Sequence, residues 1–160
     1  GGALSTLFKG LPEERDLLLL LLQGKLSAVD IRRLKPESFT LASGRRLVEI
    51  AHTHLDPDGR ISLRAVLDEA MEDSDCGAIA TELSMREDYF DDVPAHIQAC
   101  LDNLDRKRTE QALRDLIERL KAAEREGRVD EVGSLNVQIN EVRMRKAGTL
   151  SAGAMTLVKE

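Results

Sequence analysis

Acidic residues at metal-ligand spacing occur between two stretches of helical pattern. Asp56, Asp58 and Gly59 fall at positions 3, 5 and 6 of a calcium-binding EF-hand loop. Such a loop also needs an acid at position 1 and a bidentate glutamate at position 12, and this chain has His54 and Ala65 there. The run Asp-Pro-Asp-Gly is equally typical of a tight turn. We therefore predict a plain helix-to-helix turn, with calcium binding as the alternative.

The other groups capable of catalysis or metal binding show no motif. His52 and His54 lie two positions apart, so on a helix their side chains point in different directions. Cys76 and Cys100 lack the spacing of a disulfide framework or a CxxC metal site, which fits a reducing cytoplasm. No Ser/His/Asp or Cys/His catalytic pattern and no glycine-rich phosphate loop is visible. We predict a non-enzymatic chain without catalytic, cofactor-binding or metal-binding residues.

Composition limits both the fold and the partners. Of the 160 residues, 42% are hydrophobic but only 2% are aromatic, which favours an all-α core built from aliphatic side chains. The formal net charge of −6 argues against duplex nucleic acid as the main ligand and favours a protein partner. The apolar run of residues 17–22 is far shorter than the roughly 20 residues that cross a bilayer, so we expect no membrane association.

Residues 106–147 predict two helices folded back on each other. Their apolar residues recur at the three-four-three spacing of a helix seam. On the first limb these are Leu113, Leu116, Leu120 and Ala123, and on the second they are Val132, Leu135, Ile139 and Val142. The two series are mirror-symmetric about the junction of Gly127 and Arg128, as an antiparallel hairpin requires. We expect Gly127 to end the first helix in the left-handed conformation and Asp130 to cap the second.

Residues 12–105 predict a globular multi-helix subdomain that precedes the hairpin. Helices are expected over residues 12–23, from Ser27 to just before Pro36, and over residues 41–55, 62–72 and 75–85, with a long helix starting near Asp92 and Pro94. We expect Ser27, Ser62 and Asp92 to cap the helices that begin at them. The leucines of residues 17–22 surround their helix axis, so that helix is expected at the buried centre. The apolar seam lapses at residues 105–108, where we expect a break or a hinge. Residues 1–11 are predicted to be a flexible start and residues 148–160 a mobile tail, with a last helical turn around Leu157 as the alternative.

The second limb of the hairpin carries a further apolar pair. Val137 and Met144 lie seven positions apart on the face opposite the seam, with Asn140 and Glu141 between them. Methionine adapts well to partner surfaces, so this back face is a candidate partner stripe. Packing of the same face on the globular subdomain is the alternative, and the sequence leaves both open.

Several sequence stretches together resemble one known family. They are ERDLLLLLLQG at residues 14–24, LKPESFT followed by RRLVEIA within residues 34–51, ISLRAVLDE at residues 61–69, and the stretch from HIQACLDNLDRKR to EVRMRKAG at residues 96–148. With them, nearly the whole chain resembles the C-terminal domain of bacterial DnaG-type primase, and residues 96–148 look like the end of the primase. Each feature is a helix pattern, so the resemblance depends on their order and spacing.

The resemblance implies a non-catalytic domain that docks on the N-terminal domains of the replicative helicase and holds primase at the bacterial replication fork, in the cytoplasm. The zinc-binding and polymerase domains of the primase would precede residue 1. In some relatives this domain also receives the C-terminal tail of single-stranded-DNA-binding protein. We expect partner contacts from Val137, Asn140, Glu141 and Met144 on the back stripe, Arg143 and Arg145 beside it, and Arg119, Arg125 and Arg128 near the hairpin tip.

Two other functions stay open. The N-terminal domain of the replicative helicase is similar in fold, but it usually opens with a Pro-x-x-x-Glu-Ala-Glu lead that this sequence lacks, and a linker and an ATPase domain would follow it. A self-associating helical scaffold would instead use the hairpin to form stable dimers.

Overall fold

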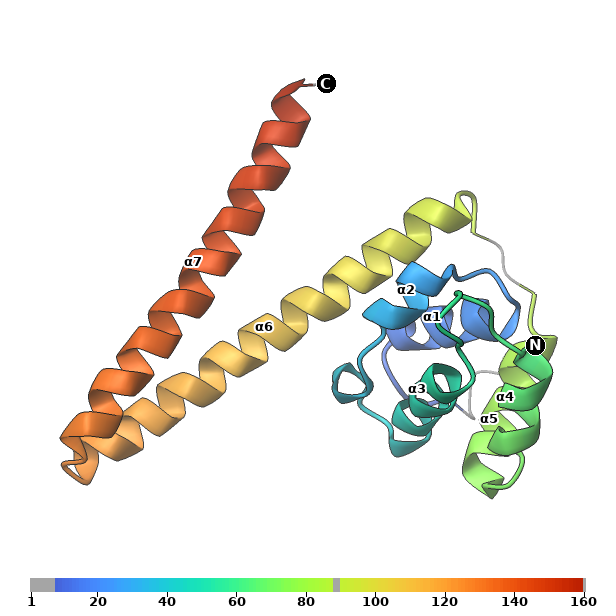
Figure 1. Ribbon diagram of the computed structural model, residues 1–160, viewed down its shortest axis with the longest axis horizontal. Coiled ribbons are helices and arrows are strands. Elements are labelled where there is room, and N and C mark those ends of the chain that lie inside the picture. Colours follow the sequence, from blue (N-terminus) through green and yellow to red (C-terminus); the bar gives the residue numbers. More distant parts are fainter. Residues whose placement is uncertain (1–7, 88–89, 160) are drawn as a thin grey trace. The chain divides into compact units, whose positions relative to one another are not determined.

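The computed structural model describes the backbone of residues 8–87 and 90–159 and the side chains as far as Gly148. Throughout these residues the regular structure is helical, which confirms the all-α prediction (Figure 1). The elements are α1 (Pro12–Leu22), α2 (Ala28–Arg33), the short 3-10 helix η2 (Pro36–Ser38), α3 (Ala42–Thr53), α4 (Leu63–Ala70), α5 (Ser74–Met85), α6 (Val93–Arg125) and α7 (Val129–Lys159).

The chain divides into two compact units, and the division falls between Asp105 and Arg106. Helix α6 itself is continuous through residues 105–108, so the prediction of a break there is wrong, and a hinge stays a prediction. Arg106, Lys107 and Arg108 have high helix propensity, and no glycine or proline interrupts the run, so the helix persists where the apolar seam lapses.

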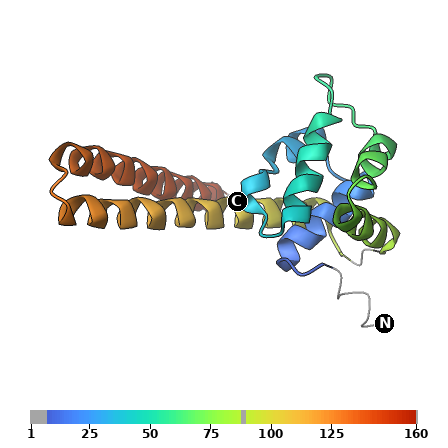
Figure 2. The ribbon, with the colours of Figure 1, turned by 90° about the horizontal axis from the view of Figure 1, so that it is seen from below.

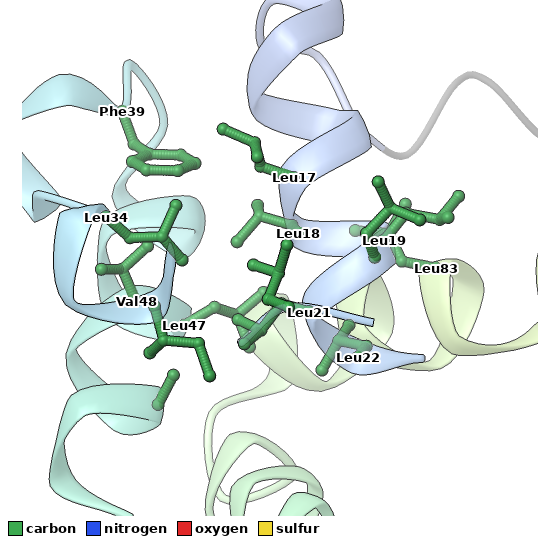
Figure 3. Packing of buried hydrophobic residues seen from close by; sticks show 14 of the residues in the cluster. Leu17, Leu18, Leu19, Leu21, Leu22, Leu34, Phe39, Leu47, Val48 and Leu83 are labelled. Atoms are coloured by element: carbon green, nitrogen blue, oxygen red, sulfur yellow. The ribbon is translucent and has the colours of Figure 1, made fainter. Parts of the chain in front are cut away.

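Helix α1 is the buried centre of the first unit, as predicted. Pro12 occupies its first turn, and Glu13 and Glu14 follow where negative charge suits the helix dipole. All of Leu17–Leu22 are buried. Figure 3 shows Leu17 and Leu18 beside Phe39, while Leu19 points toward Leu83 of α5 on the other side. Burial around the whole circumference explains why the helix carries six consecutive leucines.

A buried carboxylate fastens the start of α1 to the loop before α3. Glu14 is completely buried, and its Oε1 accepts hydrogen bonds from the backbone N of Thr40 at 2.6 Å and from Thr40 Oγ1 at 3.1 Å. Its Oε2 accepts from the backbone N of Leu11 at 3.3 Å. A carboxylate removed from water needs such donors, so these bonds offset the cost of burying its charge.

Side-chain caps fix where the other helices of this unit begin. Ser27 Oγ accepts from the backbone N of Asp30 at 3.1 Å, and Ser62 Oγ accepts from the backbone N of Ala65 at 3.2 Å. Asp92 Oδ1 accepts from the backbone N of Ala95 at 3.1 Å, at the start of α6. These three caps were predicted, and each satisfies an amide that has no partner within its helix.

Both ends of the chain depart from their predictions. Of the predicted flexible start, residues 1–7 lie outside the described residues, but Phe8 is buried in the core of the first unit. Helix α7 runs to Lys159, so the prediction of a tail from residue 148 is wrong, while residue 160 lies outside the described residues. Each helical glycine costs only about 1 kcal/mol, and the alanine, leucine and methionine residues around Gly148 and Gly153 favour the helix.

Candidate functional site

The turn between α6 and α7 is built on one glycine. Gly127 has a φ of 70°, the left-handed conformation that was predicted. The backbone N of Arg128 donates to Ala123 O at 3.0 Å and that of Gly127 to Glu124 O at 3.3 Å, which is the Schellman pattern of a helix end. Helix α7 begins at Val129, so the predicted cap Asp130 is instead the second residue of its first turn. There its charge still suits the helix dipole, because the first amides of the helix point toward it.

Helix α7 runs back from the turn in the direction opposite to α6, and the two helices diverge with distance from the turn (Figure 1 and Figure 2). The predicted seam residues are all buried or half-buried: Leu113, Leu116, Leu120, Ala123, Val132, Leu135, Ile139 and Val142. Farther from the turn, Lys146 Nζ lies 3.6 Å from Glu110 Oε1 and joins the two helices by an ion pair. The seam therefore uses one face of α7 and leaves the opposite face for other contacts.

The opposite face of α7 is the candidate docking surface, which we call the back stripe: Val137, Asn140, Glu141 and Met144. At about 100° per residue, these four residues fall within one third of the helix circumference. All four are exposed, and the two apolar members are among the most exposed large hydrophobic side chains, Val137 at 59% and Met144 at 69%. The stripe is about 10 Å long, at 1.5 Å per residue.

The predicted arginines surround this stripe or lie toward the turn. Arg143 and Arg145 are exposed on α7 on either side of Met144. Arg125 ends α6, and Arg128 connects the two helices, with Nη2 at 2.8 Å from Glu126 Oε2 and Nη1 paired with Glu131. Arg119 is exposed on α6, six residues before its end. The turn thus carries arginines whose charge is partly balanced by neighbouring acids.

The EF-hand-like segment is a turn closed by its own backbone. Leu55 and Ile61 form an antiparallel bridge, and the backbone N of Asp56 donates to Arg60 O at 2.8 Å. The Asp56 carboxylate accepts from the backbone N of Arg60 at 2.9 Å, and Gly59 has a φ of 88°. Asp56 therefore serves the turn, as Asp-Pro-Asp-Gly chemistry predicts.

The two neighbouring histidines face different partners. His52 Nε2 lies 2.9 Å from Ile31 O, whereas His54 Nε2 lies 3.2 Å from Glu69 Oε1 on α4. The expected divergence of their side chains is therefore confirmed. A shallow cleft of about 420 Å³ adjoins His52, and its lining is Arg32, Lys35, His52, Leu55, Asp56 and Pro57.

A group that sequence reasoning missed lies in the first unit. Asp16 of α1 meets His96 and Cys100 of α6, although 80 positions separate Asp16 from His96. His96 Nε2 lies 2.9 Å from Asp16 Oδ2 and 3.5 Å from Cys100 Sγ. The sequence signal was the four-residue spacing of His96 and Cys100, which places both on one face of a helix. A catalytic Cys-His-Asp relay needs the acid and the thiol on opposite ring nitrogens, so this geometry does not support one.

Comparison of the chain with protein-family models, with curated proteins and with solved structures found no match. Within the part of the chain that the structure describes, no helix combines the length and the apolar character of a membrane span.

Proposed function

We propose that this chain is the helicase-docking domain of a bacterial DnaG-type primase and that helix α7 contacts the N-terminal domains of the replicative helicase. The proposal rests on the resemblance in the order and spacing of the helix patterns. The observation that carries it furthest is the back stripe, because the hairpin seam uses one face of α7 and leaves Val137 and Met144 exposed on the opposite face. The chain itself supplies no chemistry in this proposal.

The stripe suits a partner that brings both apolar and polar contacts. Val137 and Met144 supply adaptable apolar contact area, and Asn140 and Glu141 supply hydrogen-bonding groups between them. The arginines near the turn would steer acidic residues of the helicase N-terminal domains toward this face. Such steering weakens with added salt. Docking would raise the local concentration of the primase polymerase at the fork and bias the helicase toward the conformations that bind the domain more tightly.

The direct test is co-elution of the chain with the cognate replicative helicase. Together, the exposed portions of Val137 and Met144 contribute about 2.5 kcal/mol when buried on a partner, taking about 2 kcal/mol for each complete side chain. Changing both residues to aspartate removes this contribution and places charge at the contact. We expect binding to weaken about 50-fold or more.

A matched control comes from the first unit. Val29 and Met85 are also one valine and one methionine, exposed by 65% and 79%, and they lie on α2 and α5. Changing this pair to aspartate should leave helicase binding unchanged. Equal loss in both double variants would point to a general charge effect, and unchanged binding by a helical Val137→Asp, Met144→Asp protein would remove the stripe from the proposal.

The same variant distinguishes helicase docking from the alternative of a self-associating scaffold. An exposed stripe can also bury itself against a second copy of the chain, and light scattering over a range of concentrations detects such dimers. The scaffold would be supported, and the docking function refuted, if the unaltered chain forms stable dimers and does not bind the helicase. The Val137→Asp, Met144→Asp variant should then be monomeric.

A further inference from the structure

Three side chains of different chemistry converge at the junction of α1 and the start of α6. Asp16 Oδ2, His96 Nε2 and Cys100 Sγ all lie within 4.8 Å of one another. Asp16 and Cys100 are buried, whereas the His96 side chain is 32% exposed. We propose that these three residues form a binding site for one Zn²⁺ ion, with water as the fourth ligand.

The distances are close to those of a tetrahedral zinc site. Zinc bonds of about 2.3 Å to sulfur and about 2.0 Å to nitrogen place these two ligand atoms about 3.5 Å apart at the tetrahedral angle. Cys100 Sγ and His96 Nε2 lie 3.5 Å apart in this chain. The 2.9 Å between His96 Nε2 and Asp16 Oδ2 must widen by only about 0.4 Å to admit the ion.

Neighbouring groups hold the ligands in place. Arg15 Nε donates to Asp16 Oδ1 at 3.1 Å, which leaves Oδ2 directed at His96. The ring of Phe90 stacks on the imidazole of His96 with centroids 4.1 Å apart and thereby limits its rotation. Such supporting contacts raise metal affinity because they fix ligand orientation before the ion arrives. The exposed edge of His96 gives the ion a path from solvent.

The ligand set selects the metal. One thiolate, one imidazole and one carboxylate suit a borderline-soft ion such as Zn²⁺, whereas Ca²⁺ and Mg²⁺ prefer oxygen ligands alone. The thiolate and the carboxylate together balance the charge of the ion. The thiol proton leaves to solvent as the Zn–S bond forms.

The chain offers internal controls for two of the three ligands, Cys100 and His96. Cys76 is also a buried free cysteine, but its Sγ donates to Ser43 O at 3.5 Å and it belongs to no convergent group among the described residues. His54 likewise pairs with a carboxylate, that of Glu69, with no cysteine in that pair. Cys76→Ser and His54→Gln are therefore matched to Cys100→Ser and His96→Gln.

The test is titration of the chelator-treated chain with Co²⁺, followed by displacement with Zn²⁺. We expect one equivalent of Co²⁺ to bind with a near-ultraviolet thiolate-to-cobalt charge-transfer band that Zn²⁺ abolishes. Cys100→Ser should lose the band, and His96→Gln should weaken binding more than about tenfold. Cys76→Ser and His54→Gln should behave like the unaltered chain, with far-ultraviolet circular dichroism showing that every variant is folded.

The proposal is overturned if the unaltered chain shows no charge-transfer band or if Cys100→Ser keeps it.

Discussion

Replacing Gly127 or Gly133 by alanine should shift the stability of the hairpin in opposite directions. At both positions an added Cβ would meet nothing within 4 Å, so only the backbone conformation distinguishes them. Gly127 has a φ of 70°, where alanine costs about 1 to 2 kcal/mol, so Gly127→Ala should destabilise the hairpin. Gly133 lies within α7, where alanine is favoured over glycine by about 0.5 to 1 kcal/mol, so Gly133→Ala should stabilise it.

The assay is native-state hydrogen exchange of the α7 amides, because local opening reports the stability of this hairpin by itself. A gap of about 2 kcal/mol between the two variants corresponds to about a 30-fold difference in protection. Amides of α1 in the first unit serve as the internal reference and should not change. Protection that moves in the same direction in both variants, or an unaffected Gly127→Ala protein, would refute the left-handed turn on which the hairpin depends.

Two further predictions concern the first unit. Glu14→Ala should lower the free energy of unfolding by about 2 to 3 kcal/mol in urea titration, because Leu11 and Thr40 lose a buried charged acceptor; a loss below about 0.5 kcal/mol would contradict this role. Burial raises the pKa of both the Cys76 and Cys100 thiols from 9.0 to about 11, so metal-free folded protein retains thiol protons that the unfolded chain releases. The free energy of unfolding should therefore fall as the pH rises from about 9 to about 11. A melting temperature that does not change over this pH range would refute the raised thiol pKa values.

Local chemistry explains why much of the fold could be predicted. The scarcity of aromatic residues indicated an all-α chain, and Ser27, Ser62 and Asp92 each cap the helix that their position predicted. Caps and turns involve residues a few positions apart, so their signals lie within one short window. The placement of Val137 and Met144 on the face opposite the seam followed from helix periodicity in the same way, whereas their exposure did not.

Other features depended on the balance between helix propensity and tertiary contacts, or on contacts between residues far apart in the sequence. The break expected at residues 105–108 is absent because helix propensity outweighed the missing apolar contacts. Phe8 lies in the core although it falls within the predicted flexible start, where no helix pattern marks it as buried. Asp16 meets His96 only after α1 and α6 pack, and no pattern near either residue predicts a partner 80 positions away.

The turn at Gly127 also restricts how natural variants of this arm can change in length. The seam positions of both limbs lie at matched sequence distances from Gly127. Inserting one residue into either limb therefore rotates the seam residues on the far side of the insertion by about 100° and exposes their apolar side chains to water. Paired insertions of seven residues, one in each limb, preserve the facing positions with a drift of only about 20°. The arm can therefore lengthen or shorten in matched seven-residue steps, which moves its tip about 10 Å at a time.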